Sequence, residues 1–186
     1  MDNHNFDIVV IGSGVIGHSI AFRLKQDDPQ LKIAVLGDPV NSLQASRAAA
    51  GMLAPFCECD KADRFFKFCR ESLDKFPQFL QELASVSEVS VHFSFKGSLM
   101  PSSNYRETWE ERKRFFAEEA IPHELWSVDK VRQKAPYLSE DCGEVMWVGE
   151  GQVNNRQMHD ALMQASRNLG NHVLEANVSG FIRQGA

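Results

Sequence analysis

The chain begins with a short apolar run that leads directly into a glycine-rich turn: residues 6–17 read FDIVVIGSGVIG. The run Ile8–Ile11 shows no alternation of apolar and polar residues, which is typical of a strand buried in a parallel sheet. A helix is expected from Gly17 to Lys25, and residues 32–36 (KIAVL) form a second buried strand. This order predicts a βαβ unit with a right-handed crossover. The residues expected on the packed side of the helix are Ile16, Ile20, Ala21 and Leu24.

The glycines of the turn follow the spacing G-x-G-x-x-G between a strand and a helix. Gly12 allows a sharp turn, Gly14 lets a diphosphate approach the backbone, and Gly17 lets the helix pack closely on the strand. The helix N-terminus also offers free N–H groups and a partial positive charge. We therefore expect the ADP half of a dinucleotide here, with an ordinary glycine-rich turn as the alternative. The residues expected to line the site are Gly12, Ser13, Gly14, Val15, Ile16 and Gly17.

An acidic residue that binds the ribose hydroxyls is expected where the second strand ends. Gly37 follows the strand directly, and Asp38 comes next. This departs from the simplest pattern, but Asp38 can serve if the strand end turns by one residue. Since no basic residue lies nearby to accept a 2′-phosphate, NADP is disfavoured.

Beyond the βαβ unit, the elements suggest a second, interrupting part of the chain. A helix is expected over residues 63–84, with a break at Pro77. The alternation over residues 89–95 predicts a half-buried antiparallel strand, with a hairpin partner beginning at residues 97–100. A helix at 155–169 and strands at 172–175 and 178–182 could return to the first sheet. The predicted fold class is α/β: a Rossmann-type unit at residues 1–85, interrupted by part of an α+β antiparallel-sheet domain at 86–148, with a return segment at 149–186.

A second motif lies after the βαβ unit. Residues 46–55 read SRAAAGMLAP, which resembles the flavin-contacting segment of the D-amino-acid oxidase superfamily, and within it the glycine oxidase branch. Weaker similarities follow in the order of that family: Gly97–Leu99, Leu125–Ser127 with Ala135–Pro136, Glu150–Asn154, and Val178. The resemblance covers essentially the whole chain.

The resemblance implies FAD as the cofactor, with the Rossmann-type unit as its binding domain and residues 86–148 as part of a substrate domain. It places Ser46, Arg47, Ala48, Ala49, Gly51 and Met52 along the isoalloxazine and diphosphate, and Val178 against the adenine. The implied reaction is oxidation of the C–N bond of a small amino acid or amine, with dioxygen as electron acceptor. No catalytic residue is named, because the family's carboxylate-binding residues and second FAD segment have no counterpart here. The chain is therefore expected to be an N-terminal portion, inactive unaided.

Several alternatives stay open from the residues alone. An NAD-linked dehydrogenase module or a non-catalytic dinucleotide-binding protein also fits the turn. Arg47 could be a surface arginine and Met52 a core methionine. His18 is expected to pack beside the turn; the histidines expected at the surface are His92, His159 and His172.

Composition narrows the remaining function classes. A net charge of −5 argues against general nucleic-acid binding. No secretory leader or membrane span is expected, so a cytoplasmic location is the default. The four cysteines are expected to be reduced thiols, and no metal site is predicted. The oligomeric state is left open.

Overall fold

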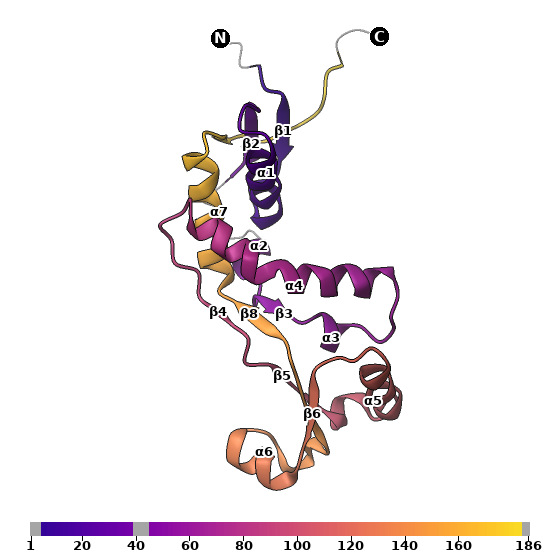
Figure 1. The fold of residues 1–186 in the computed structure, drawn as a ribbon. Helices are drawn as coiled ribbons and strands as arrows, with labels where there is room; N and C mark the ends of the chain where they lie inside the picture. Colours follow the sequence, from indigo (N-terminus) through magenta and orange to yellow (C-terminus); the bar gives the residue numbers. More distant parts are fainter. Residues whose placement is uncertain (1–4, 39–44, 184–186) are drawn as a thin grey trace. The chain divides into compact units, whose positions relative to one another are not determined.

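The structure, a computed structural model, describes residues 5–38 and 45–183. The chain divides into two compact units, each described here by itself. The first comprises Met1–Gly51, Gln78–His92 and Asn154–Ala186, and the second comprises Met52–Pro77 and Phe93–Val153. Figure 1 labels the elements in chain order.

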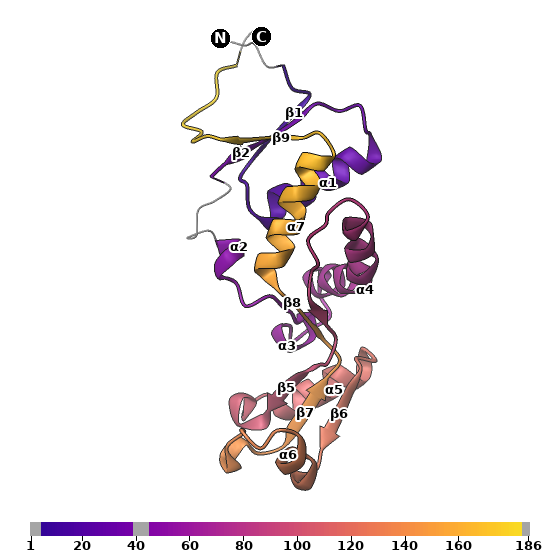
Figure 2. The ribbon, with the colours of Figure 1, turned by 90° about the vertical axis from the view of Figure 1, so that its left-hand side faces the viewer.

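The first unit is built on a parallel sheet with the strand order β1-β2-β9. Ile8 lies opposite Ile33 in the first strand pair, and Ala34 lies opposite His172 in the second. The helices α1 and α7 contact each other, and they also contact β2 and β9 respectively (Figure 2). Its elements are β1 (Ile8–Ile11), α1 (Val15–Asp27), β2 (Ile33–Gly37), α2 (Ala45–Ala48), the end of α4 (Arg64–Ala84), α7 (Asn155–Asn168) and β9 (His172–Glu175).

One face of this sheet is packed by α1, and the other is exposed along β1 although Ala34 of β2 is buried there. Ala21 of α1 packs with Ile33 and Val35 of β2, and all three are fully buried. On the opposite face, Val9 is 48% exposed and Ile11 is 50% exposed. The alternation of side chains along a strand places both on the side away from this core.

The second unit contains two antiparallel three-stranded sheets, ordered β3-β8-β4 and β5-β7-β6. Its core joins apolar side chains from α3, α4, α5, β5 and β7 around the fully buried Phe66, Phe116 and Met146. Its elements are β3 (Met52–Leu53), α3 (Pro55–Glu58), the first part of α4, β4 (Phe93–Ser94), β5 (Ser98–Pro101), η1 (Ser102–Tyr105), α5 (Trp109–Glu118), β6 (His123–Trp126), α6 (Val128–Lys134), η2 (Glu140–Cys142), β7 (Val145–Val148) and β8 (Gly151–Val153).

Five local predictions from sequence are wrong. The strand predicted over residues 89–95 is confined to β4, because its partner β8 offers only three residues for pairing. Helix α4 continues through Pro77, because its amphipathic face is buried on both sides of that residue, at Leu73 and Leu83. β5 pairs with β7 rather than forming a hairpin with residues 93–94, since the long-range pair buries Met100 against a better apolar partner. Residues 178–182 form no strand, because among the described residues they pair with no neighbouring strand. Ile16 is 74% exposed and Ile20 is 47% exposed, because α1 turns its face at His18, Ala21 and Phe22 inward instead.

A buried carboxylate fixes the start of α3. Glu150 is fully buried, and its Oε1 accepts hydrogen bonds from the backbone N–H groups of Phe56 at 2.6 Å and Cys57 at 2.8 Å. These N–H groups have no partner within the short helix, so the carboxylate satisfies them. This contact joins the segment after β7 to α3 inside the second unit.

We predict that Glu150→Ala lowers the free energy of unfolding by about 3 kcal/mol, because two buried N–H groups lose a charged acceptor. Urea unfolding followed by circular dichroism measures the change. Glu118→Ala, at an exposed position of α5, is the matched control and is expected to change little. Equal effects of the two substitutions would contradict the role assigned to Glu150.

Candidate dinucleotide-binding site

The turn between β1 and α1 is shaped by backbone contacts that exclude side chains. Gly12 has a φ of +113° and donates its N–H to the carbonyl of Leu36 at 2.7 Å. A Cβ on Gly17 would lie 1.9 Å from the carbonyl oxygen of Gly12. Only glycine fits either position, so the first turn of α1 packs directly on the backbone that leaves the strand.

The N-terminus of α1 keeps its positive character. Its first turn contains no acidic residue, and Gly14 caps it without a side-chain hydrogen bond. Val15 donates its N–H to the Ser46 hydroxyl at 3.0 Å, which brings α2 against the turn. A Cβ on Gly14 would lie 2.9 Å from this same hydroxyl. An anion bound here would therefore share the helix end with Ser46, and it would approach bare backbone at Gly14.

A cavity of about 650 Å³ opens where the parallel strands end. The rule for open α/β sheets places ligands at this carboxyl edge. Gly12 from the turn lines it, together with the predicted Asp38 and Val178. Glu175, which the sequence reasoning missed, adds a second carboxylate from the end of β9. The full lining is Ile11, Gly12, Leu36, Gly37, Asp38, Glu175, Ala176, Asn177 and Val178.

The residue that precedes Asp38 is a glycine for a steric reason. A Cβ on Gly37 would lie 2.5 Å from the Ser13 Oγ and 2.7 Å from the Ser13 backbone nitrogen. The end of β2 thus packs against the turn, and the acidic side chain can appear only one residue later.

The alanine-rich segment is partly helical and exposed. Ala48 is the last residue of α2, and Ala48 and Ala49 are both exposed. Gly51 has a φ of +75°, at the end of the first unit. Met52 opens β3 in the second unit and is exposed, so it is not a core methionine. The short side chains leave backbone accessible, which suits contact with a flat ring, but their contact with a flavin stays a prediction.

Arg47 is engaged by α7. Its Nη1 donates to Asp160 Oδ1 at 2.6 Å and lies 3.4 Å from His159 Nδ1. It is therefore not a free surface arginine. The guanidinium instead fixes α2 to the first turns of α7.

Two histidines are buried between α1 and α7. The prediction that His159 lies at the surface is wrong: it is fully buried, because α7 is covered over more of its circumference than its apolar stripe indicates. His18 is buried beside the turn, and its Nδ1 contacts the Ser166 hydroxyl at 3.0 Å. Their rings meet edge to face, with centroids 5.7 Å apart. His92 and His172 are exposed, as expected.

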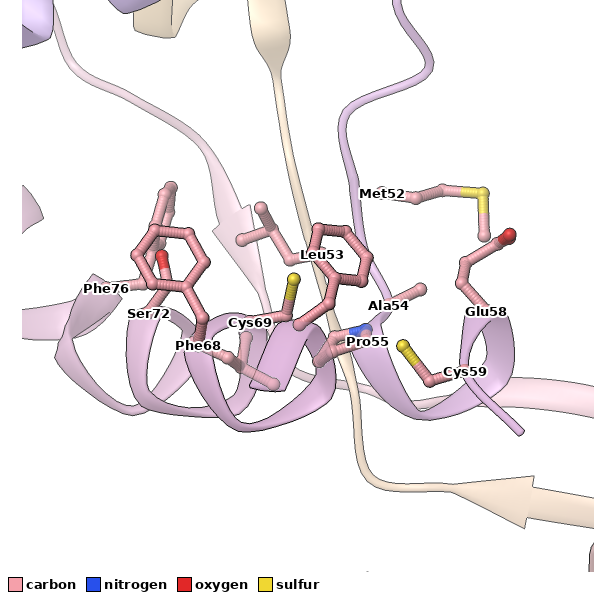
Figure 3. A pocket seen from close by; sticks show the side chains of 12 residues that line it. Met52, Leu53, Ala54, Pro55, Glu58, Cys59, Phe68, Cys69, Ser72 and Phe76 are labelled. Atoms are coloured by element: carbon pink, nitrogen blue, oxygen red, sulfur yellow. The ribbon is translucent and has the colours of Figure 1, made fainter. Parts of the chain in front are cut away.

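A second cavity, of about 440 Å³, lies within the second unit beside Met52 (Figure 3). Its walls are mostly apolar, and it is lined by the thiols of Cys59, which follows α3, and Cys69 of α4. No arginine or lysine lines it. Burial and a hydrogen bond with Glu150 raise the pKa of the neighbouring Cys57 thiol, and burial also raises the pKa of Cys59, so neither is poised as a thiolate. Over the described ranges 5–38 and 45–183, no three His, Cys, Asp or Glu residues cluster as a metal site.

The buried position of His18 predicts an acid sensitivity. Burial, followed by the nearby His159 and Arg167, lowers the pKa of His18 from 6.5 to about 4. Between pH 6.5 and about pH 4, His18 binds a proton in the unfolded chain but stays unprotonated in the folded protein. The free energy of unfolding is therefore expected to fall by about 3 kcal/mol as the pH drops from 6.5 to 4.

His18→Asn tests this, because its amide can still contact Ser166 but does not titrate. Urea unfolding across this pH range should show a shallower loss of stability in the variant than in the wild type. His92→Asn, at an exposed position, is the control and is expected to keep the wild-type slope. Parallel slopes for wild type and His18→Asn would show that His18 does not cause the loss.

Several known proteins are similar to this chain. The chain is 28% identical over 177 residues to the bifunctional protein ThiO/ThiG of Synechocystis, covering 91% of this chain and 24% of that protein. It is 38% identical over 86 residues to the glycine oxidase of Bacillus licheniformis, covering 46% of this chain and 23% of that protein. In fold it is similar to the crystal structure of glycine oxidase from Geobacillus kaustophilus, with a TM-score of 0.83 and 23% identity, over 93% of this chain and 47% of that one.

The chain thus spans less than half the length of these relatives. None of the helices in the described part of the chain is long and apolar enough to cross a membrane. The family model described as FAD dependent oxidoreductase matches residues 7–186. The match covers nearly the whole chain, and the glycine-lined turn, the parallel sheet and the cavity at its carboxyl edge lie within it. This chain therefore belongs to the family of FAD-dependent oxidoreductases that includes D-amino-acid oxidase.

Proposed function

We propose that this chain is the FAD-binding portion, with part of the substrate domain, of an oxidase that acts on the C–N bond of a small amino acid or amine. The observation that carries the proposal is the turn at Gly12–Gly17, whose three glycines leave backbone without side chains beside the cavity at the carboxyl edge of the sheet. Relatives named glycine oxidase support the reaction class and the small substrate. Dioxygen as electron acceptor belongs to the same proposal.

The residues of the site fit the ADP half of FAD. Gly14 offers bare backbone at the positive end of α1, where the diphosphate would lie. Asp38 and Glu175 offer carboxylate acceptors for the ribose hydroxyls, and Val178 offers an apolar contact for the adenine. The cavity is large enough for an adenosine, and no basic side chain lines it to favour a 2′-phosphate.

When bound, FAD supplies the capacity to accept a hydride from the substrate carbon. What this chain contributes is position and electrostatics. The positive end of the α1 dipole can attract the negatively charged diphosphate, and the hydroxyl of Ser46 can orient that diphosphate. Met52 is exposed beside an apolar cavity, where it could exclude water from the substrate.

We also propose that the group binding the substrate carboxylate lies outside the second cavity. The polar side chains that line this cavity are Glu58, Ser72 and two cysteines, and none carries a positive charge. A carboxylate placed there would lack a counter-ion. These 186 residues are therefore expected to bind the cofactor without turning over substrate unaided.

Gly14→Asp is expected to abolish FAD retention, because its carboxylate would occupy the diphosphate position and its Cβ would press on Ser46. The measurement is the flavin absorbance of the purified protein after incubation with FAD and desalting. Gly180→Asp is the matched control, since nothing lies within 4 Å of a Cβ there. Equal flavin content in both variants would rule out this placement of the site; retained NAD with no flavin would favour the dehydrogenase alternative.

The FAD-loaded wild-type protein is expected to keep its oxidised absorption spectrum when glycine, sarcosine or D-alanine is added without oxygen. The physical reason is the missing counter-ion for the substrate carboxylate. Free FAD with the same amino acids is the control. Bleaching of the protein-bound flavin would show that these residues suffice for catalysis and would contradict the expectation.

A further inference from the structure

His159 is a polar residue on the buried side of α7. Its neighbours Met158 and Leu162 on the helix are buried as well. A buried imidazole is costly unless its nitrogens have partners. Both nitrogens of His159 have one, and both partners come from elements that form the candidate dinucleotide site.

The two contacts fix the protonation state of the ring. Nε2 lies 2.9 Å from the carbonyl oxygen of Ser13, and a carbonyl can only accept, so Nε2 carries the hydrogen. Nδ1 lies 3.4 Å from Nη1 of Arg47, and a guanidinium can only donate, so Nδ1 carries the lone pair. Nε2 is therefore the hydrogen-bond donor to the turn, while Nδ1 faces the guanidinium of Arg47 and lies 3.7 Å from Oδ1 of Asp160.

The hydrogen bond to Ser13 sets the orientation of a peptide group in the turn. The Ser13–Gly14 peptide is trans, so its C=O and N–H point in opposite directions. Because His159 holds the Ser13 carbonyl toward α7, the N–H of Gly14 is turned away from α7. Gly14 is the position where a diphosphate would meet bare backbone.

Neighbouring residues of α7 hold the other wall of the site. Asn155 donates its side-chain amide to the carbonyl of Ser46 at 2.7 Å. Asp160 accepts from Arg47, whose guanidinium also faces His159. The first turns of α7 thus hold both the phosphate-binding turn and α2, although they are more than 100 residues away in the sequence.

We propose that His159 is a positioning residue for the diphosphate: its Nε2–H keeps the Ser13–Gly14 peptide in the orientation that presents the Gly14 N–H to the ligand. This inference rests on the proposed function, because it assumes that the turn binds the diphosphate of FAD. A ring that merely fills space would need no hydrogen at Nε2. The donor is therefore the feature to test.

Three substitutions separate the donor from the ring. His159→Gln places an amide N–H close to the position of Nε2, His159→Asn places one only near Nδ1, and His159→Leu removes both. Isothermal titration with ADP, FAD and adenosine measures affinity, and thermal unfolding without ligand measures stability. His92→Gln and His92→Asn are matched controls at an exposed histidine.

Gln is expected to bind ADP and FAD within about threefold of wild type, whereas Asn and Leu are expected to bind them about tenfold more weakly, the loss of one hydrogen bond to the turn. Adenosine, which lacks phosphates, is expected to bind all variants alike. Wild-type ADP affinity in Asn and Leu would overturn the proposal, and so would an equal loss in Gln. If wild-type protein binds neither ADP nor FAD, the proposed function fails, and this inference fails with it.

Nitrogen-15 NMR of the wild-type protein tests the same claim without any variant. The ring nitrogen signals of His159 are first assigned by linking them to its backbone resonances. At neutral pH, Nε2 is then expected to carry a hydrogen and Nδ1 to carry none. A ring without a hydrogen at Nε2 would overturn the proposal even if no variant folds.

Discussion

The close approach of α1 to the backbone at Gly12 is the constraint on which the first unit depends. With 1.9 Å between the Gly12 carbonyl oxygen and any Cβ at residue 17, the helix can reach this position only without a side chain there. This approach brings Ala21 onto β2, and it aims the N-terminus of α1 toward the carboxyl edge of the sheet. The same constraint therefore gives the unit both its packing and its electrostatic character.

A second constraint comes from the far end of the chain. α7 contacts α1 and α2, and its polar residues, rather than its apolar stripe, hold the turn and the segment after β2. The surroundings of His18 between α1 and α7 disfavour a charge on its ring, since burial lowers its pKa to about 4. The candidate dinucleotide site thus combines two stretches of sequence that neither local propensity nor a short motif connects.

Local physics made part of this structure predictable. The parallel pairing of β1 with β2 and the helix between them follow from an apolar run, a glycine turn and a helical repeat. Helix α7 and strand β9 were also predicted, as was the family from the SRAAAGMLAP segment.

The errors came from tertiary contacts. β5 pairs with β7, which lies far away in the sequence. α4 continues through Pro77 because the helix is packed on both sides of that residue. His159 was missed because a polar residue beside an apolar stripe looks exposed until its partners are known. Glu175 belongs to no motif. Its place in the candidate site follows only from the structure, in which it lies opposite Gly37 and lines the cavity.

The exposed apolar side chains of β1 have a consequence for how the protein behaves in solution. Val9 and Ile11 lie on β1, the outermost strand in the order β1-β2-β9. A strand in that place, short of charge and apolar on its open side, is a template for adding another strand in solution. At the concentrations used for crystallisation, self-association along β1 would lower the solubility of the protein. A charged residue at position 9 would suppress this association, and it would leave the packing of α1 on β2 unchanged.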